Sequence, residues 1–167
     1  MIALVKPSER YLASYREAYE EYRKHGISTY HFDNANEHDI FEKYENYRLG
    51  RNLKPNRVPA DYYWLVDEEN EYFIGEISIR HRLSDILRKY GGNIGYGVRY
   101  GEWGKGYGTL MLKLALEKAG CLGLDRILIT CDDDNPASAR VMEKNGFKME
   151  DKILHDGVLI RRYWKVV

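Results

Sequence analysis

A glycine-rich run stands between a strand-like stretch and a helix-like stretch, and its residue types suit the binding of an anion. The run is Trp103-Gly104-Lys105-Gly106-Tyr107-Gly108-Thr109, and an apolar helical pattern begins at Leu110. Glycines at alternate positions let the backbone approach a ligand without a Cβ in the way, and the turn presents free N–H groups at the positive end of the next helix. We therefore expect this run to cradle a phosphate or pyrophosphate.

Two common nucleotide-binding motifs do not fit the run. A Walker loop requires Gly, four residues and then Gly-Lys-Ser/Thr, but Gly106 follows Lys105 and Arg99 stands at the earlier glycine position. A dinucleotide fingerprint that starts at Gly95 or Gly104 would require a third glycine at Tyr100 or Thr109. A tight strand-to-helix turn with no ligand remains the alternative.

A second motif follows about thirty residues later, where Asn135-Pro136 opens a helical pattern that ends at Glu143-Lys144-Asn145-Gly146-Phe147. From about Tyr62 to the C-terminus, this order of motifs resembles the GNAT superfamily of N-acetyltransferases. The resemblance implies that the glycine loop binds the pyrophosphate of acetyl-CoA, that the asparagine lies along the pantetheine arm, and that this arm pairs with the main chain of the preceding strand. The residues implied to bind the cofactor are Gly97, Val98, Arg99, Lys105, Gly106, Tyr107, Gly108, Thr109, Leu110 and Asn135.

Three positions depart from the family pattern. Trp103 replaces the Gln or Arg that opens the family's loop. Met142 stands where many members have a tyrosine that reprotonates the CoA thiolate, and a thioether has no proton to give. Thr130 stands where some members place a glutamate base. The cofactor site is therefore better supported by the sequence than the catalytic groups are.

Two residues of the strand pattern 72–81, one in its middle and one at its end, are candidates for catalysis. Alternation along this strand places Glu76, Ser78 and Arg80 on the face opposite to its isoleucines. Glu76 is the preferred base or water-relay carboxylate, and the alternative is a solvated or Arg80-paired residue. His81 has a suitable intrinsic pKa, but a surface or packed histidine is the alternative reading.

Other polar groups give weaker signals. The run Asp132-Asp133-Asp134 could attract a cationic amine, or it could be a solvated loop in which Asp134 or Asn135 caps the next helix. It does not fit a calcium loop, because Pro136 and the following residues supply neither the glycine nor the spacing. Cys121 and Cys131 form no metal spacing and are expected to be reduced, packed thiols. No metal is expected.

Periodicity and turn signals predict the elements that position these residues. The expected strands cover residues 2–5, 62–66, 72–81, 93–99, 126–131, 149–154 and 159–164, and the expected helices cover residues 9–24, 38–49, 84–89, 110–122 and 136–145. Ser8 is the expected cap of the first helix, and Asp156-Gly157 is the expected turn of the last hairpin. With the resemblance, this order predicts an α/β, GNAT-like fold. Its mixed, mainly antiparallel central sheet has about seven strands and helices on both faces, in a single domain over residues 1–167.

Composition limits the possible partners. The 26 basic and 26 acidic residues cancel, which argues against a nucleic acid or an anionic membrane as a partner. No apolar run approaches the roughly 18 residues of a membrane span, and early charges such as Lys6 leave no room for a signal-peptide core. We expect a cytoplasmic protein that is a monomer or homodimer.

These observations together predict an enzyme. By resemblance it is an acetyl-CoA-dependent N-acetyltransferase in which a primary amine, from a small molecule or a protein, attacks the thioester directly. Because of Met142 and Thr130, the competing hypothesis is a module that binds CoA or acyl-CoA with weak or no catalysis.

Overall fold

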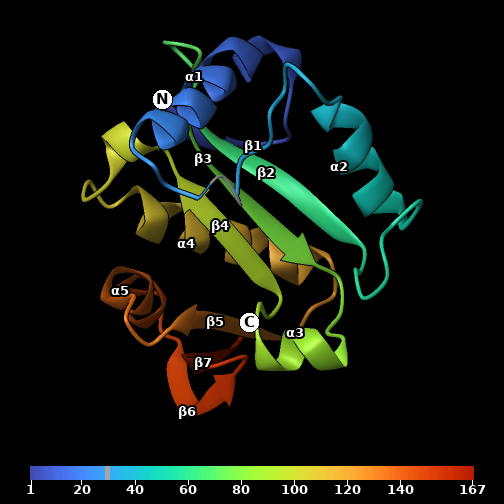
Figure 1. The fold of residues 1–167 in the computed structure, drawn as a ribbon, viewed down its shortest axis with the longest axis vertical. Coiled ribbons are helices and arrows are strands. Elements are labelled where there is room, and N and C mark those ends of the chain that lie inside the picture. Colours follow the sequence, from blue (N-terminus) through green and yellow to red (C-terminus); the bar gives the residue numbers. More distant parts are fainter. Residues whose placement is uncertain (29–30) are drawn as a thin grey trace.

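The computed structural model describes residues 1–28 and 31–167, which form a mixture of strands and helices (Figure 1). In chain order the elements are β1 (Ile2–Val5), η1 (Glu9–Tyr11), α1 (Leu12–Lys24), α2 (Ile40–Leu49), β2 (Ala60–Asp67), β3 (Tyr72–Arg80), α3 (Asp85–Lys89), β4 (Ile94–Val98), η2 (Tyr100–Glu102), α4 (Tyr107–Cys121), β5 (Arg126–Asp132), α5 (Pro136–Lys144), β6 (Lys148–His155) and β7 (Val158–Val166). Every paired strand runs antiparallel to its partner, in a sheet of order β1-β2-β3-β4 and a second of order β5-β7-β6. The predicted fold class is confirmed.

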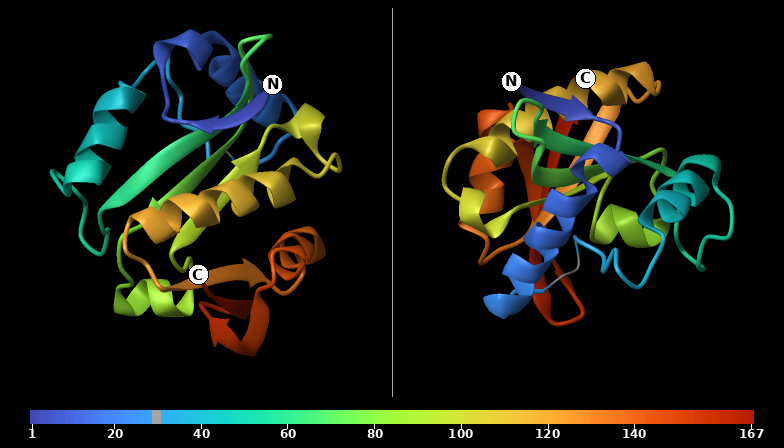
Figure 2. Two further views of the ribbon diagram at one scale, coloured as in Figure 1. Left: turned by 180° about the vertical axis from the view of Figure 1, so that it is seen from behind. Right: turned by 90° about the horizontal axis from the view of Figure 1, so that it is seen from above.

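Helices cover both faces of the larger sheet (Figure 2). On one face, Ile77 and Ile79 of β3 pack into a core with Met111 and Ala115 of α4. On the other face, an aromatic core joins α1 and α2 to the sheet, and Tyr15 of α1 stacks on Trp64 with ring centroids 4.8 Å apart. The polar residues of β3 lie on this second face, beneath α1, α2 and the segment between them.

Several element ends differ from the sequence prediction. Ser8 caps a short 3-10 turn without a side-chain hydrogen bond, and α1 begins only at Leu12. The helix expected from residue 38 begins at Ile40, because the Asp39 side chain accepts hydrogen bonds from the N–H groups of Phe41 and Glu42 and caps it. The helix expected from residue 110 begins at Tyr107, so the last three residues of the glycine run, Tyr107 to Thr109, are already helical.

Two smaller predictions have different outcomes. The last hairpin turns at Asp156 and Gly157, both with positive φ, as the Asp-Gly signal indicates. Cys131 is buried as expected, whereas Cys121 ends α4 in an exposed position, so the prediction of two packed thiols is wrong for Cys121.

The two sheets adjoin at β4 and β5, and the hydrogen bonds between these strands are at the residue just before β4. There the Asn93 N–H donates to the Leu128 carbonyl (2.7 Å), and the Leu128 N–H donates to Asn93 Oδ1 (2.9 Å). Gly92 allows this approach, because a Cβ on it would stand 2.3 Å from the Leu128 carbonyl oxygen. Farther along, within the described residues, β4 pairs only with β3 and β5 only with β7, so the two strands separate.

No helix within the described ranges combines the length and apolar character needed to cross a membrane.

Candidate functional site

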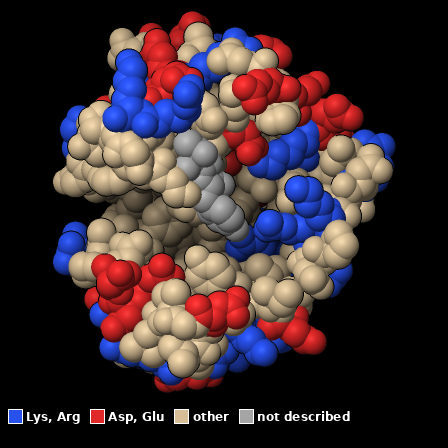
Figure 3. Space-filling model, viewed as in Figure 1, with Lys and Arg blue, Asp and Glu red and all other residues tan. Residues whose placement is uncertain are grey.

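A hollow crosses the face of the molecule where β4 and β5 separate. Figure 3 shows it between the segment that carries the glycine loop and the lower part that contains α5. A hydrogen bond between Tyr96 Oη on β4 and Ser138 Oγ on α5 (2.9 Å) links these two parts. The predicted cofactor residues therefore lie on elements that border one hollow, although they come from distant parts of the sequence.

The glycine loop ends in a helix N-terminus, as a site for an anion requires. Gly106 is the N-cap of α4 with φ +86°, a left-handed conformation that favours glycine, and the space where its Cβ would stand is open. The first bond within the helix runs from the Leu110 N–H to the Gly106 carbonyl (3.1 Å). The N–H groups of Tyr107 to Thr109 come before this first bond and have no acceptor within the helix. They form its positive end.

Side chains around the loop are paired within the protein. Lys105 Nζ lies 3.0 Å from Glu102 Oε2 and is exposed, so it stands at the rim of the loop. Trp103 Nε1 donates to the Val98 carbonyl (2.8 Å) and so ties the loop to β4. The N–H groups of the backbone, rather than side chains, are thus the groups that can bind an anion in the centre of the loop.

Gly108 lies where α4 packs against neighbouring elements. A Cβ at this position would meet Val141 Cγ2 of α5 at 3.3 Å and would lie near Tyr96 and Val98 of β4. The missing side chain therefore allows α4 to pack closely against α5 and β4.

The main chain of β4 differs in detail from the arrangement that the family resemblance implies for residues 97–99. The Arg99 N–H donates to Ile74 of β3 (2.7 Å), and the Val98 carbonyl accepts from Tyr22 Oη (2.5 Å) as well as from Trp103. Bonds to a neighbouring antiparallel strand alternate along the chain. The main chain of Tyr96 and Val98 therefore faces the gap toward β5, whereas that of Gly97 and Arg99 faces β3.

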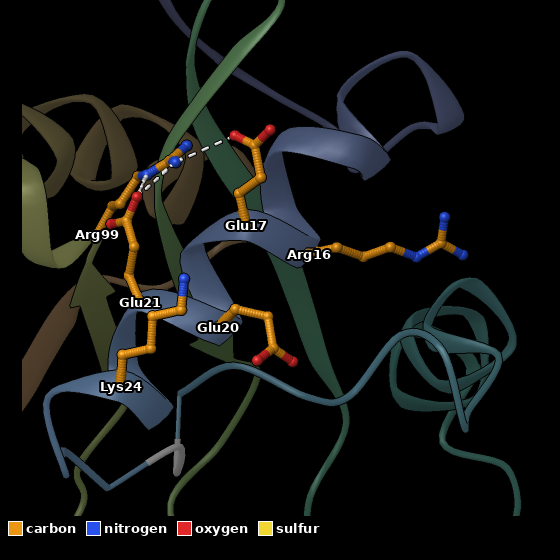
Figure 4. A pocket seen from close by; sticks show the side chains of 6 residues that line it. All are labelled: Arg16, Glu17, Glu20, Glu21, Lys24 and Arg99. Atoms are coloured by element: carbon orange, nitrogen blue, oxygen red, sulfur yellow. Dashed lines mark hydrogen bonds and ion pairs between the residues drawn. The ribbon is translucent and has the colours of Figure 1, made fainter.

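The side chain of Arg99 is a structural cation. It is buried, and its guanidinium donates to Glu21 Oε1 (2.6 Å), to Glu17 Oε2 (3.2 Å) and to Ser14 Oγ (2.9 Å), which fixes α1 to the end of β4. Figure 4 shows these carboxylates on one side of a surface cavity of about 410 Å³. Its lining is Arg16, Glu17, Glu20, Glu21, Lys24 and Arg99.

Asn135 caps α5, as one of the sequence alternatives predicted. Its Oδ1 accepts a hydrogen bond from the Ser138 N–H (3.1 Å). Asp133 instead forms ion pairs with Lys152 (2.8 Å) and Arg161 (2.6 Å), so this member of the acidic run is neutralised by the β6–β7 hairpin.

Glu76 is buried under the aromatic core and is neither solvated nor paired with Arg80. Its Oε2 accepts hydrogen bonds from Tyr44 Oη (2.5 Å) and Trp64 Nε1 (2.9 Å), and its side chain is 6 % exposed. Burial raises the pKa of Glu76 to about 7, against the opposing effects of Lys43 and of these two hydrogen bonds. Glu76 is the cross-strand neighbour of Gly97, and Gly97 lies on β4, the strand that borders the gap.

His81 does not join Glu76 in one centre. It follows the last residue of β3, and its Nε2 lies 2.7 Å from Asp61 Oδ2, while Lys6 donates a hydrogen bond to Asp61 Oδ1. Five residues at about 3.3 Å each separate it from Glu76 by roughly 16 Å along the strand direction. His81 is therefore a partly exposed hydrogen-bond partner of Asp61.

The departures from the family pattern also have structural explanations. Met142 is fully buried in the core on the α4 side, so its thioether packs instead of facing the hollow. Thr130 Oγ1 accepts a hydrogen bond from the Gly91 N–H (2.8 Å) and supports the junction of β4 and β5.

One residue near the site was missed by sequence reasoning. A Cβ on Gly97 would stand 2.7 Å from the Cβ of His31, so His31 occupies the space beside that glycine, and Arg80 similarly lies beside Gly95. Neither glycine therefore leaves open space above the backbone of β4. The sequence signal for this contact was Gly97. A glycine within a strand indicates that another group packs closely against the backbone, but it does not identify that group.

A comparison with family models identifies the chain. The model of the acetyltransferase (GNAT) domain matches residues 3–148. The chain belongs to the GNAT acetyltransferase family. It is an acetyl-CoA-dependent N-acetyltransferase, and the expected enzyme class and acetyl donor are confirmed. No curated protein matches it by sequence.

Solved GNAT structures show the same fold. RimL, a ribosomal L7/L12 alpha-N-protein acetyltransferase in complex with coenzyme A, has a TM-score of 0.70 and 16% identity, with 99% of this chain and 94% of that chain covered. The microcin C7 self-immunity acetyltransferase MccE, in complex with acetyl-CoA and AMP, has a TM-score of 0.71 and 19% identity, with 99% and 92% covered. The ribosomal-protein-S5-alanine acetyltransferase from Vibrio fischeri has a TM-score of 0.65 and 17% identity, with 99% and 91% covered.

The arrangement in this GNAT chain fits acetyl-CoA as a substrate. A helix N-terminus at Gly106 suits the pyrophosphate, and the gap beside β4 suits an extended arm. In the part of the chain that the structure describes, no group of three or more His, Cys, Asp or Glu side chains is placed to hold a metal ion.

The raised pKa of Glu76 predicts how its substitution changes stability with pH. A carboxyl group whose pKa rises on folding from 4.5 to about 7 favours the fold while it is protonated, so this contribution is complete below pH 4.5 and is lost as the pH rises through about 7. Relative to Glu76→Gln, the wild-type free energy of unfolding should fall by roughly 3 kcal/mol over this interval. Urea unfolding of both proteins at several pH values tests this, and parallel pH curves would contradict the burial effect.

Proposed function

We propose that this protein acetylates a primary amine by direct attack of the amine nitrogen on the thioester carbonyl of acetyl-CoA. The observation that supports this most strongly is Glu76, a buried carboxyl group with a pKa of about 7 beside the strand that borders the hollow. A proton acceptor works best when its pKa lies near the working pH.

The proposed reaction asks little of the side chains. The neutral amine forms the new C–N bond as the C–S bond breaks, and the CoA thiolate leaves with the electron pair. The proton of the amine passes to Glu76, directly or through a bridging water. Alignment of the two substrates supplies much of the remaining acceleration. The thiolate itself has modest basicity, because an ordinary thiol has a pKa of about 8.5.

The cofactor residues divide into three proposed roles. The N–H groups of Tyr107 to Thr109, which precede the first hydrogen bond within α4, and the loop residues Lys105 and Gly106 bind the pyrophosphate. The gap-facing main chain of β4 pairs with the pantetheine through the N–H of Val98, because the Val98 carbonyl already accepts hydrogen bonds from Tyr22 and Trp103. Gly97 and Arg99 instead face β3. Asn135 contacts the same arm from α5 while it caps that helix.

The competing proposal is a CoA-binding protein with little catalysis. It is favoured by Met142, which lies in the core, and by Thr130, which supports a strand junction, because neither can move a proton in the hollow. A panel of acceptors separates the two proposals and also identifies the acceptor class. We expect CoA release above thioester hydrolysis with a polyamine, an amino acid, an aminoglycoside or an N-terminal peptide; tight acetyl-CoA binding without such release would favour the binding protein.

Both classes of acceptor occur among solved structures with this fold. RimL is a ribosomal L7/L12 alpha-N-protein acetyltransferase, and the SpeG chimera is a spermidine N-acetyltransferase. For this chain the acceptor, the cytoplasmic location and the monomeric or homodimeric state stay predictions.

The double role of Asn135 can be tested with two substitutions. Asn135→Ser keeps a side-chain oxygen that can cap α5, whereas Asn135→Ala does not. If the amide binds the pantetheine arm, both variants should bind CoA more weakly by roughly 1–2 kcal/mol. Only Asn135→Ala should also lower the melting temperature. Titration calorimetry and thermal unfolding measure the two effects, and unchanged CoA affinity in both variants would leave Asn135 as a helix cap only.

A further inference from the structure

His31 lies in the segment between α1 and α2, directly against β4. Its Cβ, Cγ and Cδ2 stand 2.7, 3.0 and 3.3 Å from the position that a Cβ on Gly97 would occupy. Such distances leave no room for any side chain at residue 97. The imidazole therefore takes the place of the missing Gly97 side chain, on the face of the sheet that carries Glu76.

The neighbours of Gly97 show why this position is chemically important. Gly97 is the cross-strand partner of Glu76, and it lies between Tyr96 and Val98, whose main chain faces the gap toward β5. A side chain on Gly97 thus lies near both the buried carboxyl group and the strand edge along which the thioester arm is proposed to run. His31 is the side chain found there.

The surroundings of His31 keep its imidazole neutral. Burial, and to a lesser extent the positive charge of Arg80, lower the pKa of His31 to about 4. The guanidinium of Arg80 is held near β4 because its Nη1 donates to the carbonyls of Gly91 and Gly92, both at 3.0 Å. A neutral imidazole has one nitrogen that accepts a hydrogen bond, and unlike an imidazolium it does not repel a cationic amine.

We propose that His31 is a catalytic residue that contacts the attacking amine and accepts a hydrogen bond from its N–H. This inference rests on the proposed acetyl transfer. In the step, the amine lone pair forms the C–N bond, the C–S bond breaks and the thiolate leaves with its electrons. His31 orients the lone pair toward the carbonyl, while the proton released by the amine goes to Glu76 as above. The reaction therefore balances with the amine, acetyl-CoA and Glu76, and it needs no additional reactant.

The test uses His31→Gly and a second variant that moves the imidazole without removing it. His31→Gly should lower kcat/KM for the amine about 10-fold or more and leave the dissociation constant for acetyl-CoA unchanged. Added imidazole should restore part of the rate, because it can enter the vacated space. Gly97→Ala should cause a similar loss, because its Cβ would stand too close to His31.

A double variant separates the chemistry from the structure. In His31→Gly/Gly97→Ala the steric clash is absent, so the double variant should have nearly the same kcat/KM as His31→Gly alone. The two reductions in kcat/KM should therefore not be additive. The matched control is His38→Ala, which removes an exposed histidine of the same segment and should keep wild-type activity. Wild-type kcat/KM in His31→Gly, or a loss that imidazole does not restore and that follows a lower melting temperature, would overturn the role of His31. Absence of amine-dependent CoA release from the wild type would overturn this role and the proposed function together.

Discussion

Gly106→Asp is expected to abolish the thermal stabilisation that acetyl-CoA gives to the wild-type protein. Gly106 is the N-cap of α4, and its Cβ position is open, so a new side chain there meets no packed atoms of the protein. The new carboxylate would stand at the helix N-terminus, where it would repel a pyrophosphate and compete for the same N–H groups. Differential scanning fluorimetry with and without acetyl-CoA measures the effect.

Gly106→Asn is the matched control. Asn has nearly the same shape as Asp and tolerates the left-handed backbone at φ +86° about as well, but it carries no charge. It should keep a clear response to acetyl-CoA, since the loss in Gly106→Asp is electrostatic. Equal responses of the two variants would show that the anion of acetyl-CoA does not lie at this helix end.

Glu76→Gln is expected to lower turnover about 10-fold or more while acetyl-CoA binding stays intact. Gln keeps an oxygen that can accept the hydrogen bonds of Tyr44 and Trp64, but it cannot accept a proton. Wild-type activity should rise with pH through about 7 as Glu76 ionises, and the variant should lose this dependence. Steady-state rates of CoA release over a range of pH provide the measurement.

Two further variants test whether the rise of activity with pH comes from the ionisation of Glu76. Tyr44→Phe removes a hydrogen bond that lowers the pKa of Glu76, so the rise in activity should move to higher pH. Glu69→Gln makes the same chemical change on an exposed residue in the turn before β3 and should have no effect. Full activity in Glu76→Gln would exclude Glu76 as the proton acceptor.

The sequence predicted the local features well because their causes are local. The Asp-Gly turn at residues 156–157 and the cap at Asn135 each depend on a few consecutive residues, and both are present. The alternation on β3 likewise placed Glu76 on the correct face. Element ends differed by a few residues where a nearby side chain, such as Asp39, formed the cap instead.

The features that the sequence could not predict depend on contacts between distant residues. Arg99 was implied as a cofactor residue, but its side chain is bound to Glu21, 78 residues earlier in the chain. Gly108 faces Val141 of α5, and Gly97 faces His31, and neither contact follows from spacing or propensity. The candidate base was found from the sequence, whereas its burial and the histidine beside it required the packed structure.

Direct transfer from acetyl-CoA to an amine is tested most directly by following the acetyl group itself. The protein is mixed with acetyl-CoA carrying a labelled acetyl group and an acceptor identified from the panel, the reaction is quenched, and the acceptor and the intact protein are analysed by mass spectrometry. We predict labelled acetyl on the nitrogen of the acceptor, free CoA in equal amount, and no labelled protein during turnover. Labelled protein that forms and decays at the rate of turnover, or loss of acetyl-CoA without an acetylated amine, would contradict direct transfer.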